Sequence, residues 1–176
     1  MLDLRNVLQQ REQDGVAVGH FNIADFLMLK AIFESARDLK VPVIIGVSEG
    51  ERKFLGVRQA SALVRSLREE FEFPIFLNAD HTHSLQSAIE AAQAGYDAIV
   101  FDLSALPVEE NIRQTQAAIQ KLKSINPAIL IEGEIGDIGT GSEIHGSAPD
   151  LSDAATGVDH GEFAASTDAS AIRDSP

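Results

Sequence analysis

The sequence predicts an α/β fold, in which a parallel sheet is flanked by helices. Short apolar runs alternate along the chain with longer stretches whose apolar residues recur every three or four positions. This alternation is typical of repeated strand–helix units with parallel strands. The run at 41–47, "VPVIIGV", is apolar on both faces and rich in β-branched residues. It therefore reads as a strand that is buried on both sides.

The predicted elements follow in order as far as residue 136. Strands are predicted at residues 16–21, 41–47, 73–78, 97–104 and 128–136. Helices are predicted between them at residues 24–39, 57–71, 84–95 and 107–125. Terminal signals support the helices: Asp25 suits the positive start of the first helix, Ser84 and Gly95 bracket the third, and Pro107 opens the fourth.

The sequence changes character after Gly136. Residues 137–157 are rich in Gly, Ser, Asp and Thr and are predicted to form a long mobile loop. Residues 151–176 are predicted to be an irregular, poorly ordered tail, because few large apolar residues occur there in any periodic pattern.

Two architectures are compatible with these units. A five-stranded doubly wound sheet fits the length of 176 residues. An eight-stranded βα barrel fits the regular spacing but needs about 250 residues. Both place their ligand chemistry at the carboxyl ends of the strands.

Composition excludes several functions. Acidic residues outnumber basic ones by 27 to 14, which argues against nucleic acid or an anionic membrane surface as the main partner. Because cysteine is absent, any metal would need His, Asp and Glu ligands, which suit Zn, Mn, Mg or Ca. The charged N-terminus is not a signal peptide, and no apolar stretch reaches about 18 residues. A cytoplasmic location is therefore expected.

Polar residues lie at or just after the carboxyl end of each predicted strand, and parallel strands bring such ends to one face. The residues at these ends are Asn22, Ser48, Glu49, Asn78, Asp80, His81, His83, Asp102, Ser104, Glu132 and Glu134. Carboxylates and histidines that are far apart in the sequence should therefore cluster in space.

Several of these residues also have a purely structural interpretation. Asn22 could cap a helix, Ser48 could belong to a turn, and Asp102 could accept hydrogen bonds from loop amides. For His83 a capping role next to Ser84 is favoured. Glu134 is better explained by function, because an unpaired carboxylate is costly to bury on an otherwise apolar strand.

Five motifs resemble those of one enzyme family in order and spacing. They are "GHFN" (19–22), "PVIIGVSEG" (42–50), "NADH" (78–81), "VFDLSALPVEENI" (100–112) and "IEGEIGDIG" (131–139). Together they resemble the class II, metal-dependent fructose- and tagatose-bisphosphate aldolases over roughly residues 2–150. The resemblance implies that residues 1–150 are the N-terminal part of a TIM-type (β/α)8 barrel. The barrel would be incomplete, with about five βα units.

The resemblance also implies a reaction and a cofactor. The family cleaves a ketose bisphosphate reversibly into dihydroxyacetone phosphate and an aldehyde. Zinc polarises the ketone, which is the Lewis-acid role of a metal, and a second monovalent or divalent cation is allowed. A Schiff-base mechanism is disfavoured, since the nearest lysine, Lys53, is predicted to lie in a loop.

Roles can be carried over residue by residue. By resemblance, Asp80 is the acid/base that moves the proton of the C4 hydroxyl, and His81 is a zinc ligand. Asp102 and Glu134 resemble the carboxylates that hold or support a metal. Two further residues, Asn22 and Ser48, resemble substrate contacts.

The family uses two more zinc-binding histidines on later strands. His160, followed by Gly161, resembles one of them and is a further candidate metal ligand. We therefore expect a truncated family member that binds a sugar bisphosphate or dihydroxyacetone phosphate and, if folded, forms a homodimer. The alternative is a non-catalytic remnant that binds a sugar phosphate or a partner protein.

Overall fold

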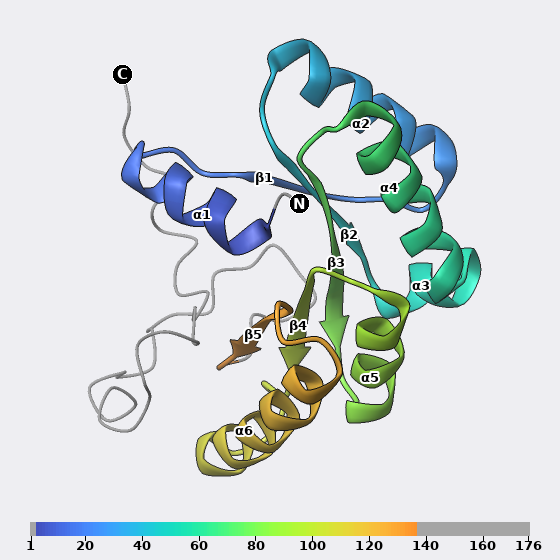
Figure 1. Ribbon diagram of the computed structural model, residues 1–176. Coiled ribbons are helices and arrows are strands. Elements are labelled where there is room, and N and C mark those ends of the chain that lie inside the picture. Colours follow the sequence, from blue (N-terminus) through green and yellow to red (C-terminus); the bar gives the residue numbers. More distant parts are fainter. Residues whose placement is uncertain (1–2, 137–176) are drawn as a thin grey trace.

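The computed structural model describes residues 3–136, which form a five-stranded parallel sheet with helices against it (Figure 1). The strands are β1 (Gly19–Asn22), β2 (Val43–Val47), β3 (Ile75–Thr82), β4 (Ala98–Asp102) and β5 (Leu130–Glu134). The helices are α1 (Leu4–Gln13), α2 (Phe26–Leu39), α3 (Glu49–Leu55), α4 (Val57–Phe71), α5 (Leu85–Ala94) and α6 (Val108–Ile125). No helix within residues 3–136 is long and apolar enough to cross a membrane.

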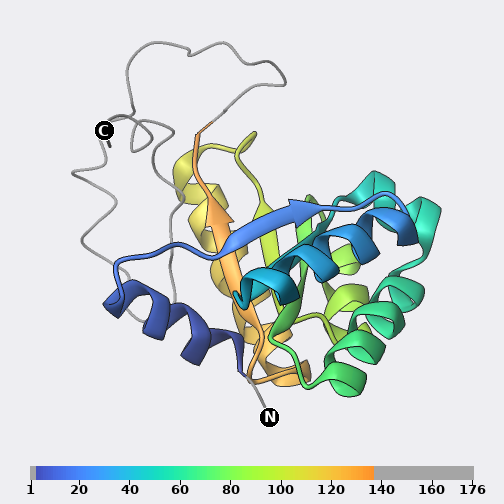
Figure 2. The ribbon, with the colours of Figure 1, turned by 90° about the horizontal axis from the view of Figure 1, so that it is seen from above.

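The strand order decides between the two predicted architectures. Each strand pairs in parallel with the next one along the chain, in the order β1-β2-β3-β4-β5. A doubly wound sheet would reverse this order at a switch point, so that alternative is wrong. Helices α2 to α6 lie along one side of the sheet, while α1 lies on the other side (Figures 1 and 2). Five successive βα units of a barrel wall explain this arrangement.

Two helices and several strand ends differ from the prediction; β1, for example, begins at Gly19 rather than at residue 16. Helix α1 was not predicted from the sequence. Its N-cap is Asp3, whose side chain accepts a hydrogen bond from the Arg5 amide at 3.0 Å. Helix α3 places Lys53 in a helix, so the predicted loop at that position is wrong. Strand β3 continues to Thr82, four residues beyond the predicted end. The polar residues in that extension conceal it, because apolar runs were the signal for a strand.

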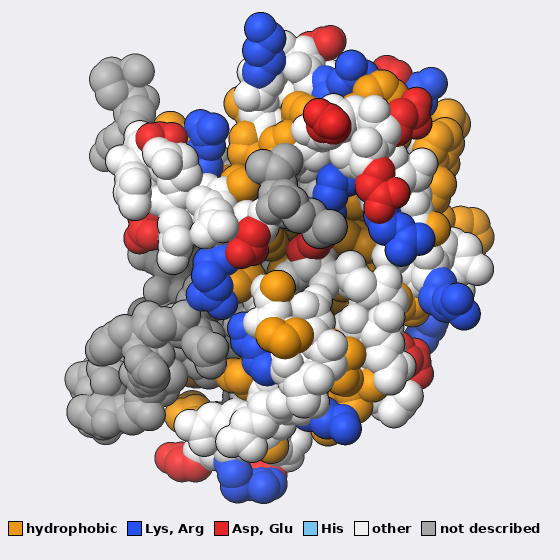
Figure 3. Space-filling model, in the orientation of Figure 1, with side chains coloured by type: hydrophobic (Ala, Val, Ile, Leu, Met, Phe, Trp, Pro, Cys, Tyr) orange, Lys and Arg blue, Asp and Glu red, His pale blue; other side chains and the backbone are white. Residues whose placement is uncertain are grey.

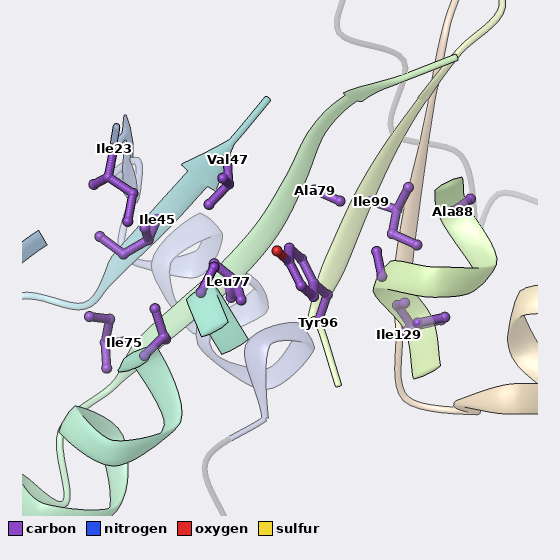
Figure 4. Close-up of a cluster of buried hydrophobic side chains, with 14 of the residues drawn as sticks. Ile23, Ile45, Val47, Ile75, Leu77, Ala79, Ala88, Tyr96, Ile99 and Ile129 are labelled. Atoms are coloured by element: carbon purple, nitrogen blue, oxygen red, sulfur yellow. The ribbon is translucent and has the colours of Figure 1, made fainter. Parts of the chain in front are cut away.

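The hydrophobic core lies between the sheet and helices α2 to α6. Residues at alternate positions of the strands, including Ile45, Leu77 and Ile99, point into this layer (Figure 4). Tyr96 is fully buried in the same layer, and its hydroxyl donates to the Val57 carbonyl at 3.3 Å. Burial raises the pKa of Tyr96 to about 12. Strand residues at the intervening positions consequently face the opposite side, where α1 lies.

An ion pair between Arg68 and Asp97 fixes the amino-terminal ends of the central strands. Asp97 precedes β4 and accepts from the Leu77 amide at 2.8 Å and from Arg68 Nη1 at 3.1 Å. Arg68 also donates to the Ile75 carbonyl at 2.7 Å. These contacts tie α4, β3 and β4 together at the end of the sheet remote from the polar strand ends.

Arg52 makes the corresponding connection at the carboxyl ends. Its side chain is only 4% exposed and comes from α3. The guanidinium donates to the Val47 carbonyl, to the Asp80 carbonyl at 3.1 Å and to Thr82 Oγ1 at 2.9 Å. A buried cation is tolerated when its donors are satisfied. Arg52 therefore joins the ends of β2 and β3 through one side chain.

Replacing this guanidinium should destabilise the protein. We expect Arg52→Met to lower the free energy of unfolding by about 2–4 kcal/mol, because the buried acceptors lose their donor. Urea denaturation measures this change. Arg113→Met is the control, since Arg113 is exposed and its ion-pair partner within residues 3–136 is Glu110 on the same helix; it should cost less than about 1 kcal/mol. Equal effects of the two substitutions would contradict the role assigned to Arg52.

Candidate metal centre

The polar strand ends border a cavity of about 850 Å³ between the sheet and α1. Alternation along β5 directs Glu132 and Glu134 to this side, and both line the cavity. Asp80 and His81 line it from the end of β3. The cavity therefore collects acidic and imidazole groups from separate parts of the sequence, as the strand-end pattern predicts.

The backbone is irregular where β3 carries Asp80 and His81. The pairing register with β4 shifts between Ala79 and Thr82, which marks a bulge. His81 has φ +40°, a left-handed conformation that is uncommon for residues other than glycine. Adjacent residues of a regular strand point to opposite faces. Here the bulge lets both side chains face the cavity, with His81 Nε2 3.9 Å from Asp80 Oδ1.

His81, Asp102 and Glu134 form a compact group at the ends of three strands. His81 Nδ1 lies 3.0 Å from Asp102 Oδ2 and 3.3 Å from Glu134 Oε2. One potential ligand atom from each residue lies within 4.8 Å of the other two. Asp102 and Glu134 are register partners on β4 and β5, which explains their proximity. One imidazole and two carboxylates are a suitable donor set for a divalent cation.

Proton affinities within the group are shifted. The hydrogen bond with Asp102 raises the pKa of His81 above its ordinary value, although partial burial opposes this. Burial would raise the pKa of Asp102, but hydrogen bonds from Ser104 and His81 outweigh it and hold that pKa below its usual value. Burial, reinforced by the charge of Asp102, raises the pKa of Glu134. Burial and Asp80 do the same for the pKa of Glu132.

Asp80 has a separate set of contacts. Its Oδ2 accepts a hydrogen bond from Asn22 Nδ2 at 2.8 Å, and the same nitrogen lies 3.5 Å from Glu51 Oε2. Asn22 does not cap helix α2, because Asp25 does so by accepting from the Met28 amide at 2.8 Å. Asn22 is thereby free to orient the carboxylate of Asp80.

Ser48 is the N-cap of helix α3. Its Oγ accepts from the Glu51 amide at 3.4 Å, and Glu51 Oε2 accepts from the Ser48 amide at 2.6 Å. This reciprocal pair is a capping box. Glu51 thus connects the cap of α3 to Asn22. A substrate contact by Ser48 stays a prediction, as it does for Asn22.

Gly46 on β2 makes room for these side chains. A Cβ at this position would lie 2.3 Å from Asn22 Oδ1 and 2.6 Å from His20 Nε2. A Cβ this close would force the ends of both side chains to move, so glycine at position 46 lets Asn22 and His20 lie over β2. His20 in turn lies with Nε2 3.2 Å from Asn78 Nδ2.

The predicted residues are thus largely brought together. Asp80, His81, Asp102 and Glu134 meet at one site, with Asn22 beside Asp80, whereas His160 lies outside the described residues. The capping interpretation of His83 is wrong, because Ser84 caps α5 by accepting from the Ser87 amide at 3.2 Å. Sequence reasoning missed Glu51 and Arg52. The Ser-x-x-Glu spacing of the capping box was a signal for the first of these.

Comparisons with known proteins identify the family. The family described as "Fructose-bisphosphate aldolase class-II" matches residues 2–173. A probable fructose-bisphosphate aldolase of Bacillus subtilis (strain 168) is 32% identical over 142 residues, which cover 79% of this chain and 49% of that protein. A fructose-bisphosphate aldolase of Helicobacter pylori (strain 26695) is 31% identical, covering 74% of this chain and 42% of its own. The chain spans about half the length of the curated relatives it matches.

Solved structures show the same relationship. The YdjI aldolase from Escherichia coli K12 superposes with a TM-score of 0.70 at 28% identity, covering 81% of this chain and 54% of that one. The fructose-bisphosphate aldolase from Campylobacter jejuni shares the fold with a TM-score of 0.68 at 24% identity, covering 77% and 46%. With the motifs, the parallel barrel wall and the family match in agreement, this chain belongs to the class II fructose-bisphosphate aldolase family.

Proposed function

We propose that this protein takes part in the zinc-dependent, reversible aldol cleavage of fructose- or tagatose-1,6-bisphosphate. The products would be dihydroxyacetone phosphate and an aldehyde. The observation that carries the proposal is the arrangement of His81, Asp102 and Glu134 as one cluster, with the Asp80 carboxylate beside it. A metal ligand set next to a separate acid/base is what a metal-assisted aldol reaction requires.

The cluster fits a zinc ion by its chemistry. Its imidazole nitrogen and carboxylate oxygens are zinc donors, and their close approach is unfavourable without a cation because two carboxylates face each other. Bound there, zinc would act as a Lewis acid on the ketone oxygen of the substrate. Asp102 orients His81, since its other oxygen, Oδ1, is fixed by the Ser104 amide at 3.0 Å and by the Ser104 hydroxyl at 2.6 Å.

Asp80 is the proposed acid/base. In the cleavage direction its carboxylate accepts the proton of the C4 hydroxyl while the C3–C4 bond breaks. C4 then leaves as an aldehyde, and the electron pair stays with the dihydroxyacetone phosphate portion. Asn22 holds Oδ2 of this carboxylate at 2.8 Å, which leaves Oδ1 to take the proton. The same groups return a proton in the synthesis direction.

The substrate is doubly anionic at its phosphates, whereas the chain carries a formal charge of −13. Basic and acidic side chains are interspersed on the face shown in Figure 3. The cavity nevertheless has basic side chains on its lining, namely Arg5, Arg11 and Lys123. Arg11 already pairs with Asp14 at 3.5 Å, and Lys123 Nζ donates to the Pro127 carbonyl at 3.4 Å ahead of β5, so these side chains are not assigned to phosphate binding.

Zinc binding should depend on pH through His81. A metal binds the unprotonated imidazole, and the pKa of His81 is raised in the metal-free protein. Protons therefore compete with zinc up to a higher pH than they would at an ordinary histidine. We expect the zinc affinity, measured by calorimetry, to fall about tenfold for each pH unit below the His81 pKa. The raised pKa of Glu134 should steepen the loss at lower pH.

Two variants make this prediction specific. His81→Ala should lose most of the zinc affinity, and the remaining affinity should vary less with pH. His20→Ala should behave as the unsubstituted protein, because His20 lines the cavity but lies outside the cluster. Zinc affinity that is independent of pH and unchanged in His81→Ala would contradict the proposed ligand.

Cleavage should depend on Asp80. Asp80→Asn keeps the shape of the side chain but removes the proton acceptor, so we expect the rate of fructose-1,6-bisphosphate cleavage to fall about 10²–10⁴-fold while zinc still binds. The assay uses the full chain with zinc, and EDTA should abolish the activity. Glu110→Gln, a change on α6 outside the cavity lining, serves as the control.

Three results are distinguishable in this assay. Cleavage that is lost in Asp80→Asn supports the proposal, and cleavage at an unchanged rate in that variant refutes the role of Asp80. An unsubstituted protein that binds dihydroxyacetone phosphate without cleaving the substrate would instead favour the non-catalytic alternative.

A further inference from the structure

His83 occupies a position that no helix-capping role explains. It follows β3 directly, two residues after His81 and outside the "NADH" motif that carries the family resemblance. Its backbone is held in place, because the His83 amide donates to Glu49 Oε1 of helix α3 at 3.1 Å. The side chain is 57% exposed, so its imidazole is accessible to solvent and to a solute.

The imidazole of His83 faces the metal cluster through Asp102. His83 Nδ1 lies 3.6 Å from Asp102 Oδ2, the same oxygen that lies 3.0 Å from His81 Nδ1. The two imidazole rings have centroids 6.4 Å apart and are tilted by 33°. One carboxylate oxygen therefore stands between the Nδ1 atoms of two histidines.

These separations are close to those of atoms that share one ion. Two ligands about 2.1 Å from a tetrahedral zinc ion are about 3.4 Å apart. The successive pairs from Glu134 to His81, from His81 to Asp102 and from Asp102 to His83 measure 3.3, 3.0 and 3.6 Å. His83 lies outside the group whose ligand atoms are all within 4.8 Å of one another, so its exposed ring must turn toward His81 and Glu134 to join the same ion. Zinc sites normally use three or four protein ligands, with imidazole favoured over oxygen for tight binding.

We propose that His83 is a further ligand of the metal bound by His81, Asp102 and Glu134. This inference rests on the proposed metal site. His83 Nδ1 now lies 3.2 Å from the Asp102 carbonyl oxygen, where it can donate a hydrogen bond. A metal bound to Nδ1 requires the ring proton to be on Nε2. The ring is exposed, so it can change to this tautomer by exchanging its proton with water. The metal then replaces that hydrogen bond as the partner of Nδ1.

His81 and His83 would then act together as a His-x-His pair of metal ligands at the end of β3. His81 reaches the cluster because of the bulge, and His83 reaches it from the turn that follows Thr82. Both imidazoles are supplied by one short segment. That segment is held by Arg52, through the Asp80 carbonyl and Thr82, and by Glu49, through the His83 amide. The backbone that carries both imidazoles is accordingly held in place, while the exposed ring of His83 can still turn toward the ion.

Metal titration of the full chain tests this role without any assay of activity. Zn²⁺ is titrated by calorimetry into the unsubstituted protein and into His83→Ala, His81→Ala and His20→Ala. We expect His83→Ala to weaken zinc binding by at least about tenfold, and His20→Ala to leave it unchanged. With Co²⁺ as a spectroscopic probe, His83→Ala should also alter the visible absorption, because one nitrogen ligand is lost. Circular dichroism verifies that each variant is folded.

The outcomes separate the two proposals. If zinc binds, His81→Ala abolishes binding and His83→Ala matches the unsubstituted protein in affinity and Co²⁺ spectrum, the role of His83 is refuted and the metal site remains. If the unsubstituted protein binds no zinc, both proposals are overturned.

Discussion

The backbone bulge at the end of β3 is the feature on which the rest of the site depends. It places Asp80 and His81 on the same side of the sheet, although adjacent residues of a regular strand face opposite sides. An unfavourable left-handed conformation at His81 is tolerated because neighbouring contacts hold the backbone. Arg52 supplies those contacts at the Asp80 carbonyl and at Thr82. Asp80, the proposed acid/base, and His81, the proposed metal ligand, thereby become neighbours while each keeps its own contacts.

Electrostatics explains why such a site should take a cation. Asp80, Asp102, Glu132 and Glu134 come from three neighbouring strands and converge on one side of the sheet. Their partial burial, reinforced by mutual repulsion, raises the pKa of both glutamates. In the metal-free protein the raised pKa of His81 shows that a positive charge is favoured among these carboxylates. A divalent ion would satisfy the same requirement with twice the charge.

Much of this arrangement could be predicted from sequence because its signals are local. Apolar runs located the strands, and Val57–Phe71 was predicted with the bounds that α4 has. The convergence of Asp80, His81, Asp102 and Glu134 followed from parallel strands alone. The sheet order needed long-range pairing and could not be decided from local patterns without the family resemblance. The position of His83 likewise depends on the bulge in β3 and on a hydrogen bond to Glu49, which lies 34 residues earlier in the chain. Neither feature is visible in a local sequence pattern.

The location of the metal tests the central claim most directly. Crystals of the full chain grown with Zn²⁺ can be measured on both sides of the zinc absorption edge. An anomalous difference peak is expected among His81 Nδ1, Asp102 and Glu134, with Asp80 outside the ligand set. A zinc peak bound elsewhere, or no peak at that cluster in crystals that contain the ion, would contradict the assignment of these strand ends as the metal centre.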